Sequence, residues 1–300
     1  MKCIICNSLS ASYFTTDFNI HFGGKLKNQL EKSEYYKCNS CGFTFSKDVY
    51  EMSQESWLEL NVKAHSQGEA APLKDRLTNQ PPYLAQASMI NMLIRDSIIY
   101  GGGGANVHNP NVNSQKCTLA KQQYNILDYA GGVGSLARIL SKYYDIDVLV
   151  YEEYMSEFKN DGLVNYIQRD KLGKYDVVIN SAMFEHITKR EHLDHINSLV
   201  SEHGTLIVHT LVRENIPKNP NWFYIQPVHC SFHTNKSMQI LMNDWGYSHS
   251  LYSPISKCWV MFKIDNPSCN KLERYAEDLN SKLQQNYFFY KKGFVDYWLD

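Results

Sequence analysis

The feature that most constrains the fold of this chain is the stretch ILDYAGGVGSLA, residues 126–137. The apolar run at its start is typical of a buried strand, and its end begins a pattern with apolar residues on one face of a helix. The glycines between them, Gly131, Gly132 and Gly134, accept positive φ and carry no Cβ, so the backbone can turn sharply and let a ligand lie against its amide groups. The stretch predicts a strand, a glycine turn and a helix that bind a nucleotide-sized ligand.

Strand and helix patterns alternate from residue 123 to about residue 210. The expected strands are YNILD, DVLVY, VNYIQ, YDVVIN and TLIVHT, followed by an antiparallel pair at about 247–255 and 258–264. The helix before the fifth strand is expected to begin with a capping box from Thr188 to Glu191 and to end before Gly204. Such alternation predicts an α/β fold of the Rossmann-like kind, a doubly wound sheet with helices on both faces.

Four cysteines near the N-terminus form two CxxC pairs, Cys3 with Cys6 and Cys38 with Cys41. A tight turn places both sulfurs of such a pair on the same side, so the two pairs can hold one tetrahedral ion. Four sulfur ligands leave no open coordination position, and we therefore expect a structural Zn²⁺ in a zinc-ribbon-like unit over residues 1–48. The alternatives are unmetallated thiols or redox chemistry, although a redox motif is usually a single CxxC at a strand-to-helix turn. The other cysteines, Cys117, Cys230, Cys258 and Cys269, have no motif spacing and are interpreted as buried or incidental thiols.

The rest of the chain divides around the α/β region. We expect a helical insertion with a Gly-rich loop over residues 49–122, the α/β domain over 123–265 and a C-terminal helix over 266–300. The loop Gly101–Gly104 is interpreted either as a lid or as an inert insertion, because consecutive glycines do not hold one conformation cheaply. The amphipathic C-terminal helix can pack on the domain or on a second subunit, which leaves a homodimer open.

The charge and hydropathy of the chain argue against a nucleic-acid-binding protein and against a membrane-spanning protein. The chain has 30 Lys and Arg against 31 Asp and Glu, so its formal net charge of -1 gives no electrostatic reason to expect nucleic acid. The N-terminal sequence lacks the apolar core of a signal peptide, and no stretch reaches the roughly 18 apolar residues of a membrane span. We therefore expect a cytoplasmic protein without a membrane span.

Two acidic residues bear on the ligand of the glycine turn. Asp128 lies just before the turn, and Glu152 ends the second strand, where a carboxylate can accept hydrogen bonds from a ribose. S-adenosylmethionine and a nicotinamide dinucleotide would both use Glu152. A carboxylate at Asp128 suits a ligand with a cationic amino group and a sulfonium, and it would repel a pyrophosphate. The pair favours S-adenosylmethionine.

With these residues the chain resembles the class I S-adenosylmethionine-dependent methyltransferases. LDYAGGVGSLA resembles their first motif, VLVYEE the second, and YDVVINSAMFEHI the later strand and loop, over about residues 123–264. The segment HCSFHTNKSMQILMNDWGY resembles the stretch after the acceptor loop in methyltransferases of bacterial sugar and glycan pathways, several of which carry an N-terminal four-cysteine zinc unit. The resemblance implies a seven-stranded sheet whose last strand is antiparallel, and S-adenosylmethionine as the cofactor.

The resemblance also implies which residues contact the cofactor. The expected cofactor-binding residues are Asp128, Ala130, Gly131, Gly132, Gly134, Glu152, Asp170 and Asn180. Ala130 stands where the family commonly has glycine, and its side chain is small enough to keep the turn. Asp170 is the candidate near the third strand for a contact to adenine. The Glu185 and His186 pair of FEHI lies, by the same resemblance, beside cofactor and acceptor.

Methyl transfer from a sulfonium is an in-line displacement, so the protein mainly positions the acceptor and removes a proton when the acceptor is a hydroxyl. A histidine suits proton removal near neutral pH. The catalytic candidates are His229, ahead of His233, in the acceptor loop, and His186 with Glu185, whose alternative role is to brace the next helix. The aromatic residues 222–224 can stack on a sugar ring or pack in the core.

We expect an O-methyltransferase that acts on a carbohydrate, either a nucleotide sugar or a surface glycan precursor, with N- and C-methylation still open. One alternative is a zinc-ribbon nucleic-acid-binding protein or an RNA methyltransferase, although residues 1–48 hold no dense Lys and Arg patch. A further alternative is an NAD(P)-dependent oxidoreductase, because AGGVGSLA is similar to the nicotinamide-binding turn of zinc-containing alcohol dehydrogenases. Against it, residues 1–122 do not resemble the catalytic domain that precedes the turn in those enzymes.

Overall fold

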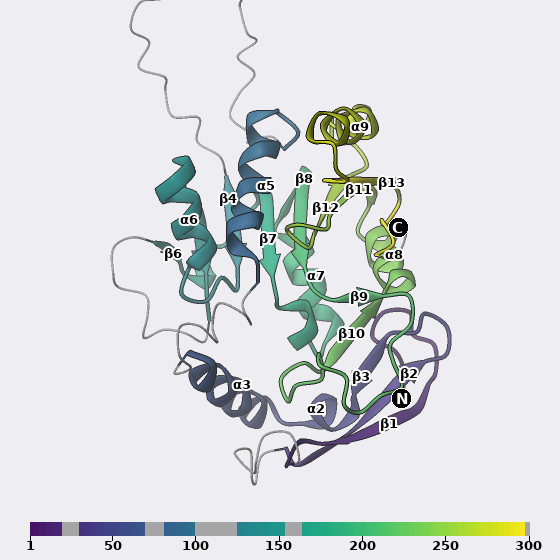
Figure 1. Ribbon diagram of the computed structural model, residues 1–300. Coiled ribbons are helices and arrows are strands. Elements are labelled where there is room, and N and C mark those ends of the chain that lie inside the picture. The colour runs from purple at the N-terminus through teal and green to yellow at the C-terminus, as the bar shows by residue number, and fades with distance from the viewer. Residues whose placement is uncertain (20–29, 70–80, 100–124, 154–163, 298–300) are drawn as a thin grey trace, which may run out of the picture.

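The computed structural model describes residues 1–19, 30–69, 81–99, 125–153 and 164–297. The expectations about the Gly101–Gly104 loop and about Cys117 concern residues outside these ranges. Within them the chain forms two sheets, a larger α/β layer and a smaller sheet that contains the N-terminal strands (Figure 1).

The larger sheet has the strand order β13-β11-β12-β8-β7-β4-β5-β6. Its strands are β4 (Ile126–Tyr129), β5 (Leu149–Tyr151), β6 (Asn165–Ile167), β7 (Tyr175–Ser181), β8 (Val200–His209), β11 (Tyr247–Ser253), β12 (Cys258–Lys263) and β13 (Phe289–Lys292). Strands β6, β5, β4, β7 and β8 are parallel, and β12 pairs antiparallel with β8. The predicted Rossmann-like sheet is thereby confirmed, with the last of the seven expected strands antiparallel.

An eighth strand extends this sheet. β13 pairs antiparallel with β11, in a segment where sequence analysis expected only a C-terminal helix. That helix is α9 (Leu272–Leu283), which ends at Gln284 in the left-handed conformation. The strand FYKK is short and partly charged, so its pattern did not distinguish it from the end of an amphipathic segment.

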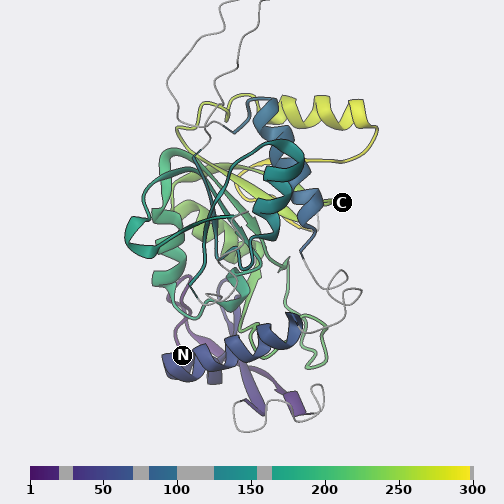
Figure 2. The same ribbon diagram turned by 90° about the vertical axis from the view of Figure 1, so that its left-hand side faces the viewer.

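Helices cover both faces of the sheet, as a doubly wound fold requires. α5 (Tyr83–Arg95), α6 (Ser135–Tyr144) and α9 share one apolar core with Ile126 of β4 and Val177 of β7. α7 (Arg190–Ser198) and α8 (Asn235–Asp244) share the other core with Leu127 and Val178, the neighbours of those two residues along the same strands. Successive strand residues thus point to opposite faces, and each face is buried under its own helices (Figure 2).

Two predictions about α7 were wrong. The helix begins after Lys189 without a side-chain cap, so Thr188 forms no capping box, and it ends at Ser198. Gly204 lies inside β8, where Tyr175 pairs with Val200 but Val177 pairs with Thr205, so β8 accommodates extra residues. A Cβ on Gly204 would lie 2.7 Å from Val200 Cγ1 and 3.0 Å from the Asp176 carbonyl oxygen, so glycine serves this irregular strand and does not stop a helix.

The second sheet joins the N-terminal strands to the segment that follows β8. Its order is β1-β2-β3-β10-β9, with β1 (Ser10–Asp17), β2 (Lys32–Cys38), β3 (Thr44–Ser46), β10 (Ser231–Thr234) and β9 (Val212–Arg213). β3 pairs antiparallel with β10, so the expected zinc-ribbon-like unit continues into the segment that carries the acceptor loop. The short helix α2 (Lys47–Glu51) and α3 (Gln54–Glu69) follow β3.

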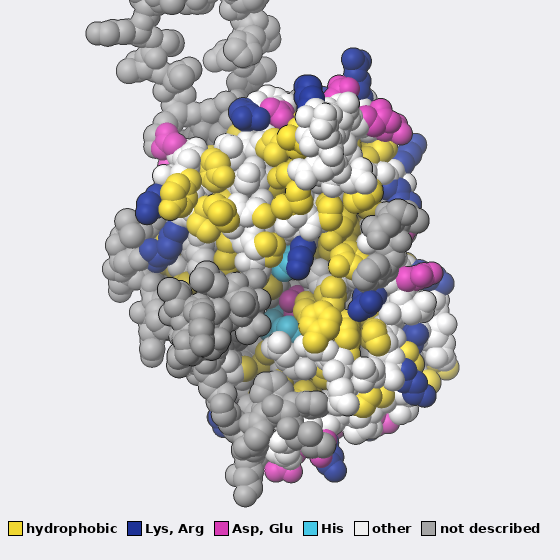
Figure 3. Space-filling model, viewed as in Figure 1, with side chains coloured by type: hydrophobic (Ala, Val, Ile, Leu, Met, Phe, Trp, Pro, Cys, Tyr) yellow, Lys and Arg dark blue, Asp and Glu magenta, His cyan; other side chains and the backbone are white. Residues whose placement is uncertain are grey.

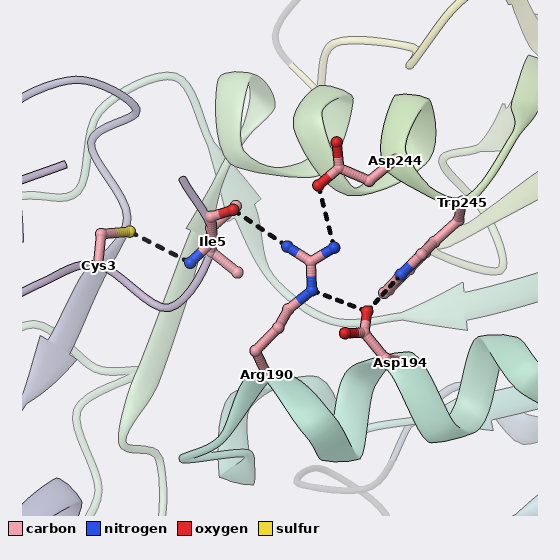
Figure 4. A network of polar contacts seen from close by, with 6 residues as sticks. All are labelled: Cys3, Ile5, Arg190, Asp194, Asp244 and Trp245. Atoms are coloured by element: carbon pink, nitrogen blue, oxygen red, sulfur yellow. Dashed lines mark hydrogen bonds and ion pairs between the residues drawn. The ribbon is translucent and has the colours of Figure 1, made fainter. Parts of the chain in front are cut away.

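Arg190 fixes the N-terminal unit against the α/β layer (Figure 4). Its guanidinium donates hydrogen bonds to Ile5 O at 3.0 Å, Asp194 Oδ1 at 2.7 Å and Asp244 Oδ2 at 3.0 Å. Ile5 lies inside the first CxxC pair, and its own N–H donates to Cys3 Sγ. One side chain therefore links the cysteine cluster to α7 and α8. No helix among the described residues is long and apolar enough to cross a membrane.

Candidate active site

The four patterned cysteines come together as sequence analysis expected. Their sulfurs lie within 4.8 Å of one another, with Cys3 and Cys41 separated by 3.7 Å and Cys6 and Cys38 by 3.5 Å. Four thiolates around one Zn²⁺ at about 2.3 Å would be about 3.8 Å apart, which is close to these separations. Backbone N–H groups of Ile5, Ser40 and Cys41 point at the sulfurs. The donor set fits a tetrahedral metal ion.

The glycine turn after β4 has the geometry that its sequence predicts. Ala130, Gly132 and Gly134 have φ of 60°, 55° and 72°. Ala130 therefore adopts the left-handed conformation at the position where the resembling family commonly has glycine, at a cost of about 1 kcal/mol. A Cβ on Gly131 would lie 2.6 Å from Asp128 Oδ2, so glycine lets this carboxyl pack against the backbone. A Cβ on Gly132 would meet nothing within 4 Å, which leaves space above the turn.

Two carboxyl groups and an amide line the turn. Asp128 is buried, and its burial, with the charge of Glu152, raises the pKa of its carboxyl to about 7. Glu152 Oε2 accepts a hydrogen bond from the Gly132 N–H at 2.9 Å. Asn180, at the end of β7, donates from Nδ2 to Tyr129 O at 3.1 Å, and its Oδ1 has no partner among the described residues. The structure brings these groups together at the carboxyl ends of β4, β5 and β7.

Asp170 lies apart from them. It is exposed in the short helix η2 (Arg169–Lys171), after β6 at the edge of the sheet. From the same edge, the Tyr166 hydroxyl donates to Gly132 O at 3.1 Å and so reaches the turn. Tyr166 was not predicted as a site residue from the sequence.

The second group of candidates forms a compact cluster of Glu185, His186 and His229. Glu185 is 2% exposed in the short helix η3 (Phe184–His186). Its Oε1 accepts from the Tyr224 hydroxyl at 2.8 Å, and its Oε2 accepts from Thr210 Oγ1 at 2.9 Å. One ligand atom from each cluster member lies within 4.8 Å of the others, a spacing at which they could share a proton or a metal ion.

The two histidines of the cluster meet at right angles. Their ring centroids are 5.0 Å apart with an interplanar angle of 87°. His229 Nδ1 lies 2.9 Å from Tyr224 O, and because a carbonyl only accepts, Nδ1 carries the proton and Nε2 remains the basic nitrogen. Burial lowers the pKa of His229, against the opposing effects of the Glu185 charge and the Tyr224 carbonyl. His229 is therefore held as a neutral imidazole that can accept a proton.

His233, the second candidate in the acceptor loop, has a different place. Its ring is 1% exposed and lies 5.0 Å from the Phe43 ring and 5.7 Å from the Phe184 ring. Burial lowers its pKa to about 4. This histidine packs between the N-terminal unit and η3, so it is a core residue and not a base.

Several residues of the site were not predicted from the sequence. The hydroxyls of Thr210 and Tyr224 donate hydrogen bonds to Glu185. Tyr83 on α5 belongs to the same region: burial raises the pKa of its phenol, and the charges of Asp128 and Glu185 raise it further. These contacts join residues that are far apart in the chain, so no local sequence pattern predicts them. Phe223 remains 75% exposed next to Tyr224, whereas Trp222 is buried.

The site opens to solvent on the face that contains the acceptor loop. Figure 3 shows histidine and acidic side chains at the surface in a hollow on this face, with hydrophobic side chains beside it. His186 and His229 are both partly exposed, so a polar acceptor can reach the cluster.

Comparison with known proteins identifies a domain family. A family model described as a methyltransferase domain matches residues 77–249, more than half of the chain. A search of curated proteins found no match. An O-methyltransferase family protein from Burkholderia thailandensis is similar at 15% identity and a TM-score of 0.36, over 48% of this chain and about half (52%) of that one.

Two further solved structures are similar. The plantazolicin methyltransferase BpumL, in complex with a monoazolic desmethylPZN analog and SAH, has 15% identity and a TM-score of 0.42, over 70% of this chain and 98% of that one. Magnesium protoporphyrin IX methyltransferase from Synechocystis PCC 6803, with bound SAH, has 16% identity and a TM-score of 0.36, over 72% and 90%. Since the family model covers most of the α/β layer and the sheet has the expected strand order, the chain belongs to the methyltransferase domain family.

Proposed function

We propose that the protein is an S-adenosylmethionine-dependent methyltransferase that O-methylates a carbohydrate, either a nucleotide sugar or a surface glycan precursor. The observation that carries this proposal is the pairing of two sites. A glycine turn flanked by Asp128 and Glu152 lies at the carboxyl end of β4, and Glu185 and His229 lie beyond the end of the neighbouring β7.

The first site fits S-adenosylmethionine. The space above Gly132 leaves room for a ligand, and Asn180 Oδ1, which has no partner among the residues that the structure describes, can accept a hydrogen bond from one. Asp128 would bind the cationic end of the cofactor and Glu152 its ribose, while Asp170 is proposed for the adenine edge. When bound, the cofactor supplies an electrophilic methyl group on a sulfonium. Its cationic amino group favours the charged form of Asp128, whose carboxyl is otherwise half protonated near pH 7.

The second site fits a hydroxyl acceptor. His229 is oriented by the Tyr224 carbonyl with Nε2 as the basic nitrogen, so it can take the proton that a hydroxyl loses during methyl transfer. Glu185 is fixed by two hydroxyl donors, and its negative charge stabilises the imidazolium that forms. His186, with its ring against that of His229, is proposed to contact the same acceptor.

A carbohydrate is favoured by the surface beside His229. The exposed ring of Phe223 follows the buried Trp222, and the Tyr224 ring lies 4.6 Å from that of His229. An exposed aromatic face next to a polar cluster suits a sugar, which has an apolar face and hydroxyl groups. A panel of nucleotide sugars, with release of S-adenosylhomocysteine as the readout, tests this choice. Turnover with none of them, and turnover with RNA instead, would reject it.

His229→Ala tests the proposed base. We expect turnover to fall about 100-fold or more while the Kd of S-adenosylhomocysteine stays within twofold, because the variant leaves the glycine turn intact. His192→Ala, an exposed histidine on α7, is the matched control and should keep full turnover. Unchanged turnover in His229→Ala would remove this residue from the mechanism.

The N-terminal cluster is proposed to bind one structural Zn²⁺ through Cys3, Cys6, Cys38 and Cys41. The ion would hold the β2–β3 turn, and Thr234 Oγ1 at the end of β10 donates to Cys41 O at 2.5 Å. β10 begins next to Cys230, whose N–H donates to Glu185 O at 2.8 Å. The zinc unit thereby supports the loop that carries His229 and takes no part in the chemistry.

A further inference from the structure

We propose that Glu185, His186 and His229 form a metal site that binds a divalent transition-metal ion such as Zn²⁺ or Ni²⁺ and that the bound ion blocks methyl transfer. The binding of the ion is inferred from this cluster alone, whereas its effect on turnover rests on the proposed function. The ligands here are imidazole and carboxylate groups, so the site is chemically distinct from the four-cysteine cluster.

The cluster combines two imidazoles and one carboxylate at short range. One ligand atom from each of the three residues lies within 4.8 Å of the others. Nitrogen and oxygen ligands on one Zn²⁺, with bonds of about 2.0–2.2 Å, are about 3–3.5 Å apart, so the three atoms need to approach one another by less than about 2 Å. His186 and His229 are half-buried, and rotation of their side chains can supply this approach.

The atoms around the cluster are those that usually orient metal ligands. A histidine that binds a metal through one ring nitrogen commonly donates from the other to a carbonyl or carboxylate. His229 Nδ1 lies 2.9 Å from Tyr224 O in this way, which leaves Nε2 for the ion. Glu185 accepts from Thr210 Oγ1 at 2.9 Å and from the Tyr224 hydroxyl at 2.8 Å, one bond to each carboxylate oxygen. Each oxygen therefore keeps a lone pair for the ion.

The two segments that carry the ligands are joined next to the cluster. The Cys230 N–H, directly after His229, donates to Glu185 O at 2.8 Å. Ser231 Oγ donates to Ile187 O at 2.5 Å. These two contacts connect η3 to the acceptor loop, so the ligands from distant parts of the chain are positioned before an ion binds.

The ligand set selects the class of ion. Imidazole nitrogen suits Zn²⁺, Ni²⁺, Cu²⁺ and Fe²⁺, whereas Mg²⁺ and Ca²⁺ prefer oxygen ligands, so two imidazoles discriminate against Mg²⁺. Three protein ligands leave at least one coordination position open, which suits an exchangeable ion better than a structural one. Histidine and acidic side chains lie at the surface in a hollow (Figure 3), so a hydrated ion can enter from solvent.

The ion and the transferred proton would use the same lone pair. In the proposed function, His229 Nε2 accepts the proton that the acceptor hydroxyl loses. A metal ion at Nε2 occupies that lone pair and compensates the charge of Glu185, so the pair no longer assists proton removal. The glycine turn supplies none of the ligands. The bound ion should therefore lower turnover without changing the affinity for the cofactor product.

Calorimetry with Ni²⁺ tests the site on the untagged full chain, loaded beforehand with one equivalent of Zn²⁺. We expect one further Ni²⁺ to bind per chain and Mg²⁺ not to bind. His229→Ala and Glu185→Gln each alter a ligand, so the Kd of Ni²⁺ should rise about 100-fold or more, and Thr210→Val, which removes an outer partner, should raise it about tenfold. His192→Ala, an exposed histidine on α7, is the control and should leave the Kd within twofold.

Initial rates test the effect on turnover. With a nucleotide sugar that is turned over, Ni²⁺ should inhibit wild type in competition with the sugar, at an inhibition constant close to the calorimetric Kd. The Kd of S-adenosylhomocysteine should stay within twofold when Ni²⁺ is present. Thermal unfolding without Ni²⁺ identifies any variant that is not folded.

Two kinds of result would overturn the inference. Wild-type protein that binds no Ni²⁺ beyond the first zinc ion, or folded His229→Ala and Glu185→Gln variants that bind it as tightly as wild type, would show that the cluster is not a metal site. Full turnover at saturating Ni²⁺ would show that the ion does not compete for the base. A chain that binds no S-adenosylhomocysteine would instead refute the proposed function, while Ni²⁺ binding still decides the metal site.

Discussion

The hydroxyl of Tyr224 connects Glu185 to the acceptor loop, so its removal should have a well-defined effect on the acceptor site. The hydroxyl donates to Glu185 Oε1 at 2.8 Å and accepts from the Leu211 N–H at 3.2 Å. A hydrogen bond to a charged acceptor contributes about 1.5–3 kcal/mol, and the buried carboxylate cannot replace this donor with bulk water. We expect Tyr224→Phe to lower the free energy of unfolding by about 2–3 kcal/mol.

The same substitution separates the acceptor site from the cofactor site. The carbonyl of Tyr224 belongs to the backbone, so His229 keeps its orientation, but Glu185 loses one of its two hydroxyl donors. Turnover should fall while the Kd of S-adenosylhomocysteine stays unchanged. Urea unfolding gives the stability and a coupled assay gives the turnover.

Tyr13→Phe is the matched control for this experiment. The Tyr13 hydroxyl donates to a neutral carbonyl, Ile216 O, at 2.8 Å in a part-buried place, so its loss should cost only about 1 kcal/mol. A Tyr224→Phe variant that loses no more stability than Tyr13→Phe would refute the view that Tyr224 holds a buried charge.

Four further outcomes are expected from the structure. Ala130 has a left-handed φ of 60°, so Ala130→Gly should raise the free energy of unfolding in urea by about 0.5–1 kcal/mol. The control Ala137→Gly, inside α6, should lower it by about 1 kcal/mol. A lower free energy of unfolding for Ala130→Gly would contradict backbone strain at Ala130. Because the pKa of Asp128 is raised to about 7 in the fold, its contribution to stability is full below about pH 4 and is lost as pH rises through 7, so Asp128→Asn should gain stability relative to wild type over that range. The same titration predicts that S-adenosylhomocysteine, through its ammonium group, binds more tightly at pH 8 than at pH 6, and a pH-independent Kd would exclude this role of Asp128. Removal of the proposed Zn²⁺ by a strong chelator, or Cys41→Ser, should lower both the unfolding temperature and turnover, because β10 is bonded to Cys41. Unchanged turnover would show that the N-terminal unit does not support the acceptor site.

The parts of the site that sequence analysis predicted are those encoded by neighbouring residues. The glycine turn, Asp128 before it and Glu152 at the next strand end follow from one βαβ pattern, because parallel strands bring their carboxyl ends to one edge of the sheet. The two CxxC pairs could also be predicted from the sequence, because each pair forms a local turn.

The parts that were missed depend on contacts between distant segments. β3 pairs with β10 across most of the chain, and a three-residue strand beside a four-residue strand leaves no periodic signal. The tertiary fold brings three residues into the site that are far from it in sequence: Tyr83, Thr210 and Tyr224. It also buries His233, which therefore packs in the core. A hydroxyl or an amide becomes functional only when a charged partner is placed against it, and that placement is not visible in the spacing of residues.

The measurement that tests the account most directly is calorimetric titration of the wild-type protein with S-adenosylhomocysteine, with Asp128→Asn in parallel. We expect saturable binding of a single molecule per chain to wild type, and weaker binding to Asp128→Asn above pH 7, where the wild-type carboxyl is charged. A wild-type protein that shows no binding by calorimetry, and no change in unfolding temperature with the ligand in excess, would contradict the assignment of the glycine turn as an S-adenosylmethionine site.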